Sequence, residues 1–187
     1  MRLALLAIAT SVLATACGTT PAPKSAQSPP VPTISTARQA IANLAPASAS
    51  LVSGKITAVP MAGGVHLTGT VGGLPPNSSH GFHVHEKGDC SAADASSAGP
   101  HFNPFAAAHG KAKSGAHHAG DMDNVVANAE GVVNVNVHLS GVTLGGGAVN
   151  DIGGRALVVH AAADDYSSQP AGNAGARVAC GVIRITQ

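Results

Sequence analysis

Short runs of apolar residues alternate with turn-forming residues along most of the chain. The runs occupy residues 39–44, 51–59, 65–71, 80–86, 124–128, 131–139, 156–160 and 178–186. Each run has the length of a strand, and glycine, proline or asparagine separates several of them, as at 61–64 and 72–77. None has a convincing helical period. The pattern predicts an all-β domain of eight short antiparallel strands, folded as a sandwich or barrel.

The interval from residue 87 to residue 120 breaks this pattern, because it has no apolar periodicity. A structureless loop of this length is uncommon in a compact domain unless something holds it in place. The interval and the residue that follows it carry Cys90, His101, His109, His117, His118 and Asp121. Bound metal and a disulfide would fix such a loop.

Residues 1–16 have the pattern of a signal peptide. Arg2 precedes a short apolar stretch at 3–13, and the Ala-Thr-Ala sequence at 14–16 matches a signal-peptidase site. The apolar stretch is too short to span a bilayer comfortably. A bacterial lipoprotein box, with its leucine one place too far from the cysteine, also ends at Cys17. Both routes cut before Cys17, so the cut position does not separate them.

Residues 17–36 are rich in Pro, Ser, Thr and Ala, which is typical of a flexible linker, and the folded domain is expected at 37–187. The chain has three cysteines, an odd number for an exported protein. A lipid on Cys17 would account for the N-terminal one, whereas the alternatives are a free thiol or an interchain disulfide. We therefore expect an exported protein of the periplasm or cell envelope, attached to the membrane only through this lipid.

Composition excludes one class of function and points to another. The formal net charge is +1 and charged residues make up 10% of the chain, so no basic surface for nucleic acid is expected. Ten histidines stand against nine acidic residues, which hints at metal binding. With no Trp, one Tyr and three Phe, the core has to be built from Val, Ile, Leu and Ala.

The run at 80–86 contains two histidines at strand spacing. Residues two apart on a strand point to the same face, so His83 and His85 lie on one side and Phe82 and Val84 on the other. Two imidazoles side by side suit copper or zinc. A single His-x-His is weak evidence, since a solvent-exposed strand face has the same pattern.

Two further groups strengthen the metal hypothesis. His101, His109, His118 and Asp121 supply a closed tetrahedral set, which is typical of a structural zinc site. His117 is the alternative to His118 at this point. Near the C-terminus, His160 ends an apolar run. In contrast, His66, His80 and His138 match no ligand motif and are predicted to be surface or strand histidines.

These motifs together resemble the copper/zinc superoxide dismutase family. The motifs are GFHVHE at 81–86, GPHFNP at 99–104, HAGD at 118–121, LVVH at 157–160 followed by DD at 164–165, and GNAGARVACGVI at 172–183. They occur in the family's order and cover the whole predicted domain. The resemblance implies an eight-stranded antiparallel Greek-key barrel with a long metal-binding loop.

The resemblance also implies a role for each motif residue. Copper would be bound by His83, His85, His101 and His160, and zinc by His101, His109, His118 and Asp121. The family's H-x-G-D spacing selects His118 over His117. Arg177 would lie at the mouth of the copper site, and Asp164 would hydrogen-bond ligands of both metals. Cys90 and Cys180 would form a disulfide.

The implied reaction converts superoxide into O₂ and H₂O₂, with a redox-cycling copper bridged through His101 to a structural zinc. It would protect against superoxide outside the cytoplasm. His101 would supply a proton and Arg177 would attract the anion. The alternatives are a copper-binding module without turnover, which would typically lack a copper ligand or Arg177, and a non-catalytic lipoprotein domain. The sequence leaves open whether the protein is a monomer or a homodimer.

Overall fold

A computed structural model describes residues 30–187, and the predicted signal peptide and Cys17 lie outside them. This part of the chain forms strands and one 3-10 turn, η1 (Ser96–Ala98). The strands are β1 (Ala40–Pro46), β2 (Ser53–Met61), β3 (Gly64–Gly72), β4 (Ser79–His80), β5 (Phe82–His85), β6 (Val125–Val126), β7 (Val133–Ser140), β8 (Ala156–His160), β9 (Arg177–Val182) and β10 (Arg184–Ile185). Within the described residues, no helix is long and apolar enough to cross a bilayer.

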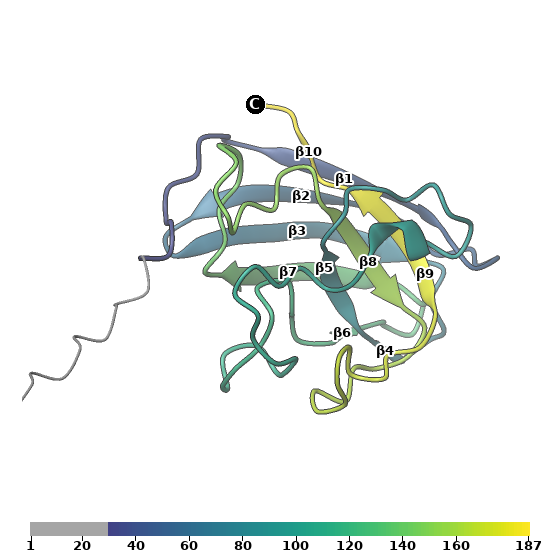
Figure 1. The fold of residues 1–187 in the computed structure, drawn as a ribbon. Helices are drawn as coiled ribbons and strands as arrows, with labels where there is room; N and C mark the ends of the chain where they lie inside the picture. The colour runs from purple at the N-terminus through teal and green to yellow at the C-terminus, as the bar shows by residue number, and fades with distance from the viewer. Residues whose placement is uncertain (1–29) are drawn as a thin grey trace, which may run out of the picture. The chain divides into compact units, whose positions relative to one another are not determined.

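The strands are arranged as a curled antiparallel sheet in the order β5-β8-β9-β1-β2-β3-β7, with β10 beside the first half of β1. Strand β1 joins the two halves: residues 40–44 pair with β2, whereas Ala45 and Pro46 pair with β9. In Figure 1, β1, β2, β3 and β7 run side by side as one layer, and β5, β8 and β9 cross it at an angle. The predicted all-β fold is confirmed.

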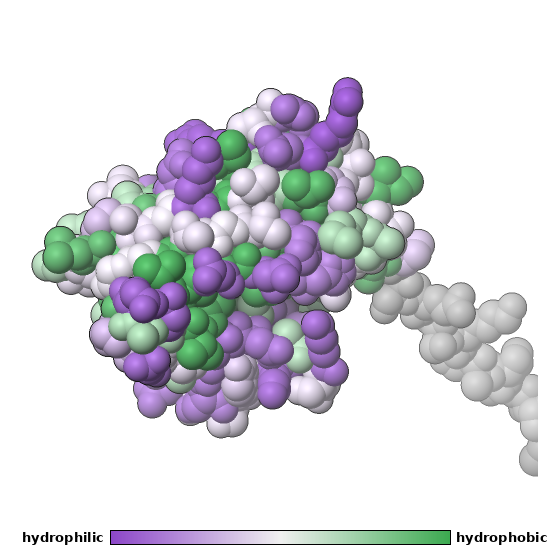
Figure 2. Space-filling model, turned by 180° about the vertical axis from the view of Figure 1, so that it is seen from behind, coloured by the Kyte–Doolittle hydropathy of each residue, from purple (hydrophilic) through white to green (hydrophobic). Residues whose placement is uncertain are grey.

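The core lies between these two layers and consists mainly of small and β-branched aliphatic residues. Val65 and Leu67 of β3 point into it, and Phe82 and Val84 of β5 face them from the other layer. The opposite face of β5 carries His83 and is equally buried, because the long loop covers it. The surface seen from behind mixes polar side chains with smaller apolar groups (Figure 2).

All eight predicted runs contain a strand, but two are divided. The run at 80–86 breaks at Gly81, so that β4 pairs with β6 in a separate small sheet while β5 pairs with β8. The run at 178–186 breaks at Ile183, where the backbone N–H donates to Arg155 instead of continuing the ladder. Both breaks move the chain from one sheet or strand partner to another, a change that hydrophobicity alone does not mark.

The long loop is attached to the sheet at several points. A disulfide joins Cys90 to Cys180 of β9, with Cα atoms 5.8 Å apart. The backbone N–H of Phe102 donates to the carbonyl of Val84 (2.8 Å), and the N–H of Glu86 donates to that of Pro100 (2.9 Å). The loop therefore continues the sheet beyond β5 and covers its free edge.

The last residues of the predicted linker also contact the domain. Asn150 donates to the carbonyl of Pro32 (2.8 Å), and the backbone N–H of Leu144 donates to the hydroxyl of Ser35 (2.9 Å). These bonds attach residues 32–36 to the loop that connects β7 with β8.

Candidate metal centre

Three histidines reach the centre from strands. His83 and His85 lie on the loop-facing side of β5, and His160 lies at the end of β8, the strand paired with β5. The loop brings His101 against them through a backbone bridge to His85. All four are buried, and one ligand atom from each lies within 4.8 Å of the others. The structure thus assembles the four residues predicted to bind copper.

The second group of four consists of Asp121 and the three histidines around its carboxylate. Oδ1 of Asp121 lies 2.8 Å from Nδ1 of His101 and 3.3 Å from Nδ1 of His118, while Oδ2 lies 3.0 Å from Nδ1 of His109. One ligand atom from each of the four lies within 4.8 Å of the others. His117 is half-buried, its ring donates to the carbonyl of Gly115, and it belongs to neither ligand group. These are the four residues predicted to bind zinc.

His101 belongs to both groups. Its Nδ1 is hydrogen-bonded to Asp121, and its Nε2 is buried without a partner. Its ring centroid lies 4.1 Å from that of His83 on one side and 5.6 Å from that of His118 on the other. One imidazole therefore separates the two groups and presents a nitrogen to each.

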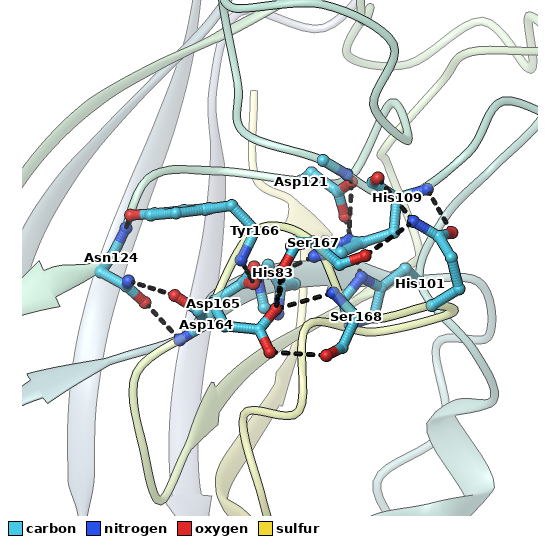
Figure 3. Close-up of polar contacts among 12 residues, drawn as sticks. His83, His101, His109, Asp121, Asn124, Asp164, Asp165, Tyr166, Ser167 and Ser168 are labelled. Carbon is cyan, nitrogen blue, oxygen red and sulfur yellow. Dashed lines mark hydrogen bonds and ion pairs between the residues drawn. The ribbon is translucent and has the colours of Figure 1, made fainter.

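Asp164 connects the two groups a second time, as Figure 3 shows. Its Oδ2 accepts from Nε2 of His83 at 2.9 Å, and its Oδ1 accepts from Nε2 of His109 at 3.0 Å. Asn124 holds the backbone of Asp164 with two hydrogen bonds of 2.8 Å. Because one nitrogen of each ring is bonded to Asp164, the other is left to face the centre. The predicted contact of Asp164 with residues of both groups is present.

The donor atoms fit the metals that these sets suggest. The nitrogens His83 Nδ1, His101 Nε2, His109 Nδ1 and His118 Nδ1 are buried and form no hydrogen bond, and those of His109 and His118 have only the nearby Asp121 carboxylate beside them. Buried polar atoms are rarely left without a hydrogen bond, so the four nitrogens are expected to bind a ligand. Four imidazoles suit copper, and three imidazoles with one carboxylate make a closed tetrahedral set for zinc.

Burial favours the neutral form of His85, His101 and His160, which is the form that binds metal. Desolvation lowers the pKa of His85 to about 2, that of His160 to about 3 and that of His101 to about 4. Burial alone would raise the pKa of Asp121 and Asp164. Hydrogen bonds from the neighbouring histidines and from backbone N–H groups outweigh it and hold both carboxyl pKa values below their usual range.

A cavity of about 1070 Å³ opens onto the first group, lined by residues that include His85, His101, His160 and Arg177. The half-buried guanidinium of Arg177 donates to the carbonyls of Ala95 and Gly99, both at 2.7 Å. The carbonyl of Gly99 also accepts from Nδ1 of His85 (2.8 Å). A fixed positive charge thus lies on the wall of the cavity that reaches these histidines.

Sequence reasoning missed several supporting residues. His80 lies in a strand, as predicted, but it is buried rather than on the surface, and its Nδ1 donates to the carbonyl of His160 at 2.8 Å. The side-chain amide of Gln169 forms two hydrogen bonds of 2.9 Å with the backbone of His109. His80 directly precedes the GFHVHE motif, and this position was the only indication in the sequence that it supports the metal centre. Gln169 has no comparable signal.

Comparison with known proteins agrees with this geometry. The family model described as copper/zinc superoxide dismutase matches residues 52–183. Copper-zinc superoxide dismutase 2 of Aquifex aeolicus is 46% identical over 136 residues, covering 71% of this chain and 80% of that protein. Copper-zinc superoxide dismutase 2 of Mesembryanthemum crystallinum is 45% identical over 129 residues, covering 66% and 80%.

Solved structures give the same result. A double mutant of a superoxide dismutase-like protein from Bacillus subtilis superposes with a TM-score of 0.70 at 36% identity, covering 77% of this chain and 96% of that one. The clock protein EA4 superposes with a TM-score of 0.72 at 40% identity, covering 82% and 98%. From the match over residues 52–183 and the 46% identity to the Aquifex protein, the chain belongs to the copper/zinc superoxide dismutase family.

Proposed function

We propose that this protein dismutates superoxide at a paired copper and zinc centre. The observation that carries the proposal is the sharing of His101 by two buried ligand groups beside a cavity whose wall carries a fixed arginine. A purely structural metal site has no need of an open cavity. A non-catalytic domain has no need of four buried ring nitrogens without partners.

His83, His85, His101 and His160 are the proposed copper ligands. Bound copper would supply one-electron redox chemistry, accepting an electron from one superoxide ion and donating it to the next. The protein holds these rings in fixed orientations, since His85 is bonded to Gly99, His160 lies 3.3 Å from the carbonyl of Gly175 and His83 is bonded to Asp164.

His101, His109, His118 and Asp121 are the proposed zinc ligands. They come from the long loop, and a closed set with no open position serves structure rather than turnover. The proposed role of this site is to order residues 101–121 and to hold the His101 ring at the angle that the first group requires. Asp164 supports that role by bonding His109 and His83 with the same carboxylate.

Arg177 is the proposed docking group for superoxide. The substrate is a small anion, and a guanidinium remains charged at every physiological pH. Its hydrogen bonds to Ala95 and Gly99 keep it on the cavity wall, so no side-chain ordering is needed when the anion binds. Between Asp165 and Arg177 the loop carries no other Asp, Glu, Lys or Arg. Attraction of the anion therefore depends on Arg177 more than on this loop.

The reaction that forms peroxide consumes protons, and His101 is the proposed source of one of them. Its Nδ1 is turned to Asp121, so Nε2 is the atom that can hold a proton on the side of the first group. This nitrogen is buried without a partner and belongs to a residue that lines the cavity. A proton on it is therefore placed at the inner end of the substrate path.

We further propose export, with removal of residues 1–16 and lipid attachment at Cys17. The Cys90–Cys180 disulfide supports export, because such bonds persist mainly outside the cytoplasm. Mass spectrometry of the mature N-terminus tests the proposal. A diacylglyceryl cysteine at position 17, absent from Cys17→Ser, is expected, whereas an unmodified Cys17 at the mature N-terminus would favour ordinary secretion.

The deciding experiment measures the superoxide dismutation rate of purified protein in three forms: metal-free, loaded with copper and zinc, and the loaded His83→Ala variant. We expect activity only in the second form. Bound copper measured in the same samples separates the outcomes. Absence of activity despite one full equivalent of copper would leave a copper-binding module as the better description.

A further inference from the structure

Two histidines outside the metal centre stand opposite each other on neighbouring strands. His66 of β3 pairs with His138 of β7 in the antiparallel register. Their chain neighbours Val65, Leu67 and Leu139 are buried in the core, so the two imidazoles lie on the outer face of the sheet. Both are half-buried. Neither belongs to the two ligand groups described above.

The spacing of this pair is close to that of rings that share a proposed metal. Ring centroids within the two ligand groups are 4.1–6.0 Å apart. The centroids of His66 and His138 are 6.3 Å apart, with the ring planes inclined by 30°. Directly opposed residues have Cβ atoms about 4.5–5.5 Å apart, so a small side-chain rotation brings both rings onto one ion.

The second observation concerns hydrogen bonding. Within residues 30–187, five histidine ring nitrogens are buried without a partner, and four of them belong to the metal centre. The fifth is Nδ1 of His66. Across β2 its register partner is Val59, which offers no polar side chain. The unsatisfied nitrogen of His66 therefore has the same signature as the nitrogens that face the proposed metals.

We propose that His66 and His138 together bind one divalent transition-metal ion, with Cu²⁺ preferred to Zn²⁺. Two imidazoles suit both ions, and copper forms the stronger complex with a given nitrogen set. Because the pair supplies only two ligands on an outer face, water completes the coordination and the ion exchanges readily. The site is an auxiliary one, separate from the centre around His101.

The edge of β7 gives the site an approach from solvent. His138 also lines a groove of about 460 Å³ together with His117 and Asp123 of the long loop. Oδ1 of Asp123 is buried without a hydrogen-bond partner. The groove thus places an additional acidic group near His138 without making it a ligand.

The test uses the Cys17→Ser form of the full chain with copper and zinc already loaded. Cu²⁺ is titrated into this protein by calorimetry, and the bound ion is observed by electron paramagnetic resonance. One further equivalent of Cu²⁺ is expected, with a spectrum different from that of the loaded copper. The extra equivalent should be lost in His66→Gln and in His138→Gln, with dismutase activity unchanged in both. Zn²⁺ should compete for it only at a higher concentration.

His117→Gln is the matched control, because it removes another half-buried histidine that lines the same groove and should keep the extra equivalent. If the glutamine variants fold poorly, His138→Lys keeps a long outward side chain and removes the metal ligand. The proposal is overturned if the wild-type protein binds no further Cu²⁺. It is equally overturned if the variants bind as much as the wild type, or if His117→Gln alone abolishes binding.

Discussion

The two ligand groups of the metal centre are built on different kinds of scaffold. His83, His85 and His160 stand on paired strands, where the ladder between β5 and β8 fixes their backbone before any metal is present. His109, His118 and Asp121 stand on a loop without regular structure. Strand pairing alone thus positions the three strand-borne histidines. The three loop-borne ligands, in contrast, depend on separate contacts that attach the loop to the sheet.

Those attachments are few and can be named. The Cys90–Cys180 disulfide joins the start of the loop to β9, and the backbone bonds of Phe102 attach its middle to β5. Asp164 and Gln169 reach His109 from the loop before β9. Since ordering a residue costs about 1–2 kcal/mol of backbone entropy, the loop is expected to lose order when any of these contacts is removed.

The sharpest test of the comparison removes one ligand from each group. In His85→Ala, dismutation should fall by more than about a hundredfold, because even outer contacts of metal ligands are worth 10–100-fold. Amide hydrogen exchange in residues 101–121 should stay at the wild-type level. In His109→Ala, bound zinc should be lost and exchange in the same residues should rise. Equal loosening of the loop in both variants would contradict the distinction between the scaffolds.

Removing the disulfide should have the next largest effect. The bridged cysteines are 90 residues apart, for which the chain-entropy model gives about 4–5 kcal/mol. Cys90→Ser combined with Cys180→Ser should lower the free energy of unfolding by about this amount in urea titrations, and Cys17→Ser is the control. A change below about 1 kcal/mol would show that the other attachments hold the loop by themselves.

Substitution of Gly172 tests the contact between Asp164 and His109. A Cβ at this position would lie 1.8 Å from Asp164 Oδ1 and 2.6 Å from His109 Nε2. Gly172→Ala should therefore lower zinc affinity about 10–100-fold, the range typical of such supporting contacts. Gly154→Ala is the matched control, since its φ is also positive (+79° against +66°) but nothing lies within 4 Å. Both variants should lose about 1–2 kcal/mol from backbone strain, and equal zinc affinities would contradict the prediction.

The free energy of unfolding of the metal-free protein should fall as the pH is lowered from about 7.5 to about 5. The pKa values of His85, His101 and His160 are lowered to about 2, 4 and 3, so the unfolded chain binds more protons than the folded one below about pH 6.5. Stability should fall by about 1–2 kcal/mol per histidine between pH 7.5 and pH 5. The depressed carboxyl pKa values of Asp121 and Asp164 extend the loss to lower pH. Urea titrations at both pH values measure the effect, and a pH-independent midpoint would refute it.

Much of the part of the metal centre that lies on strands could be predicted from the sequence. Alternation of His83 and His85 with Phe82 and Val84 assigned faces correctly, because strand geometry converts a period of two into two sides. The loop-borne set of three histidines and one aspartate was also visible in the sequence, but the choice of His118 over His117 followed only from the family's motif. Nothing in the apolar pattern places His109 beside His101, since the contact depends on the path of a loop.

The supporting contacts were less visible in the sequence. The backbone bonds between Phe102 and Val84 involve no side-chain polar group, so no residue type marks them. Gln169 and Asn124 are common polar residues, and their roles depend on which backbone groups the fold leaves nearby. The division of the run at Gly81 likewise follows from tertiary pairing rather than from local propensity.

The carboxylate of Asp164 has a thermodynamic consequence that reaches beyond positioning. Since its two oxygens bond His83 and His109, a ligand that fixes either ring also restricts the other. We therefore expect metal binding at the two sites to be cooperative, and such cooperativity is reciprocal. If metal at the loop site raises the affinity of the strand site by some factor, metal at the strand site raises the affinity of the loop site by the same factor. Partial supply of either metal should thus favour a population of fully loaded and empty molecules over half-loaded ones.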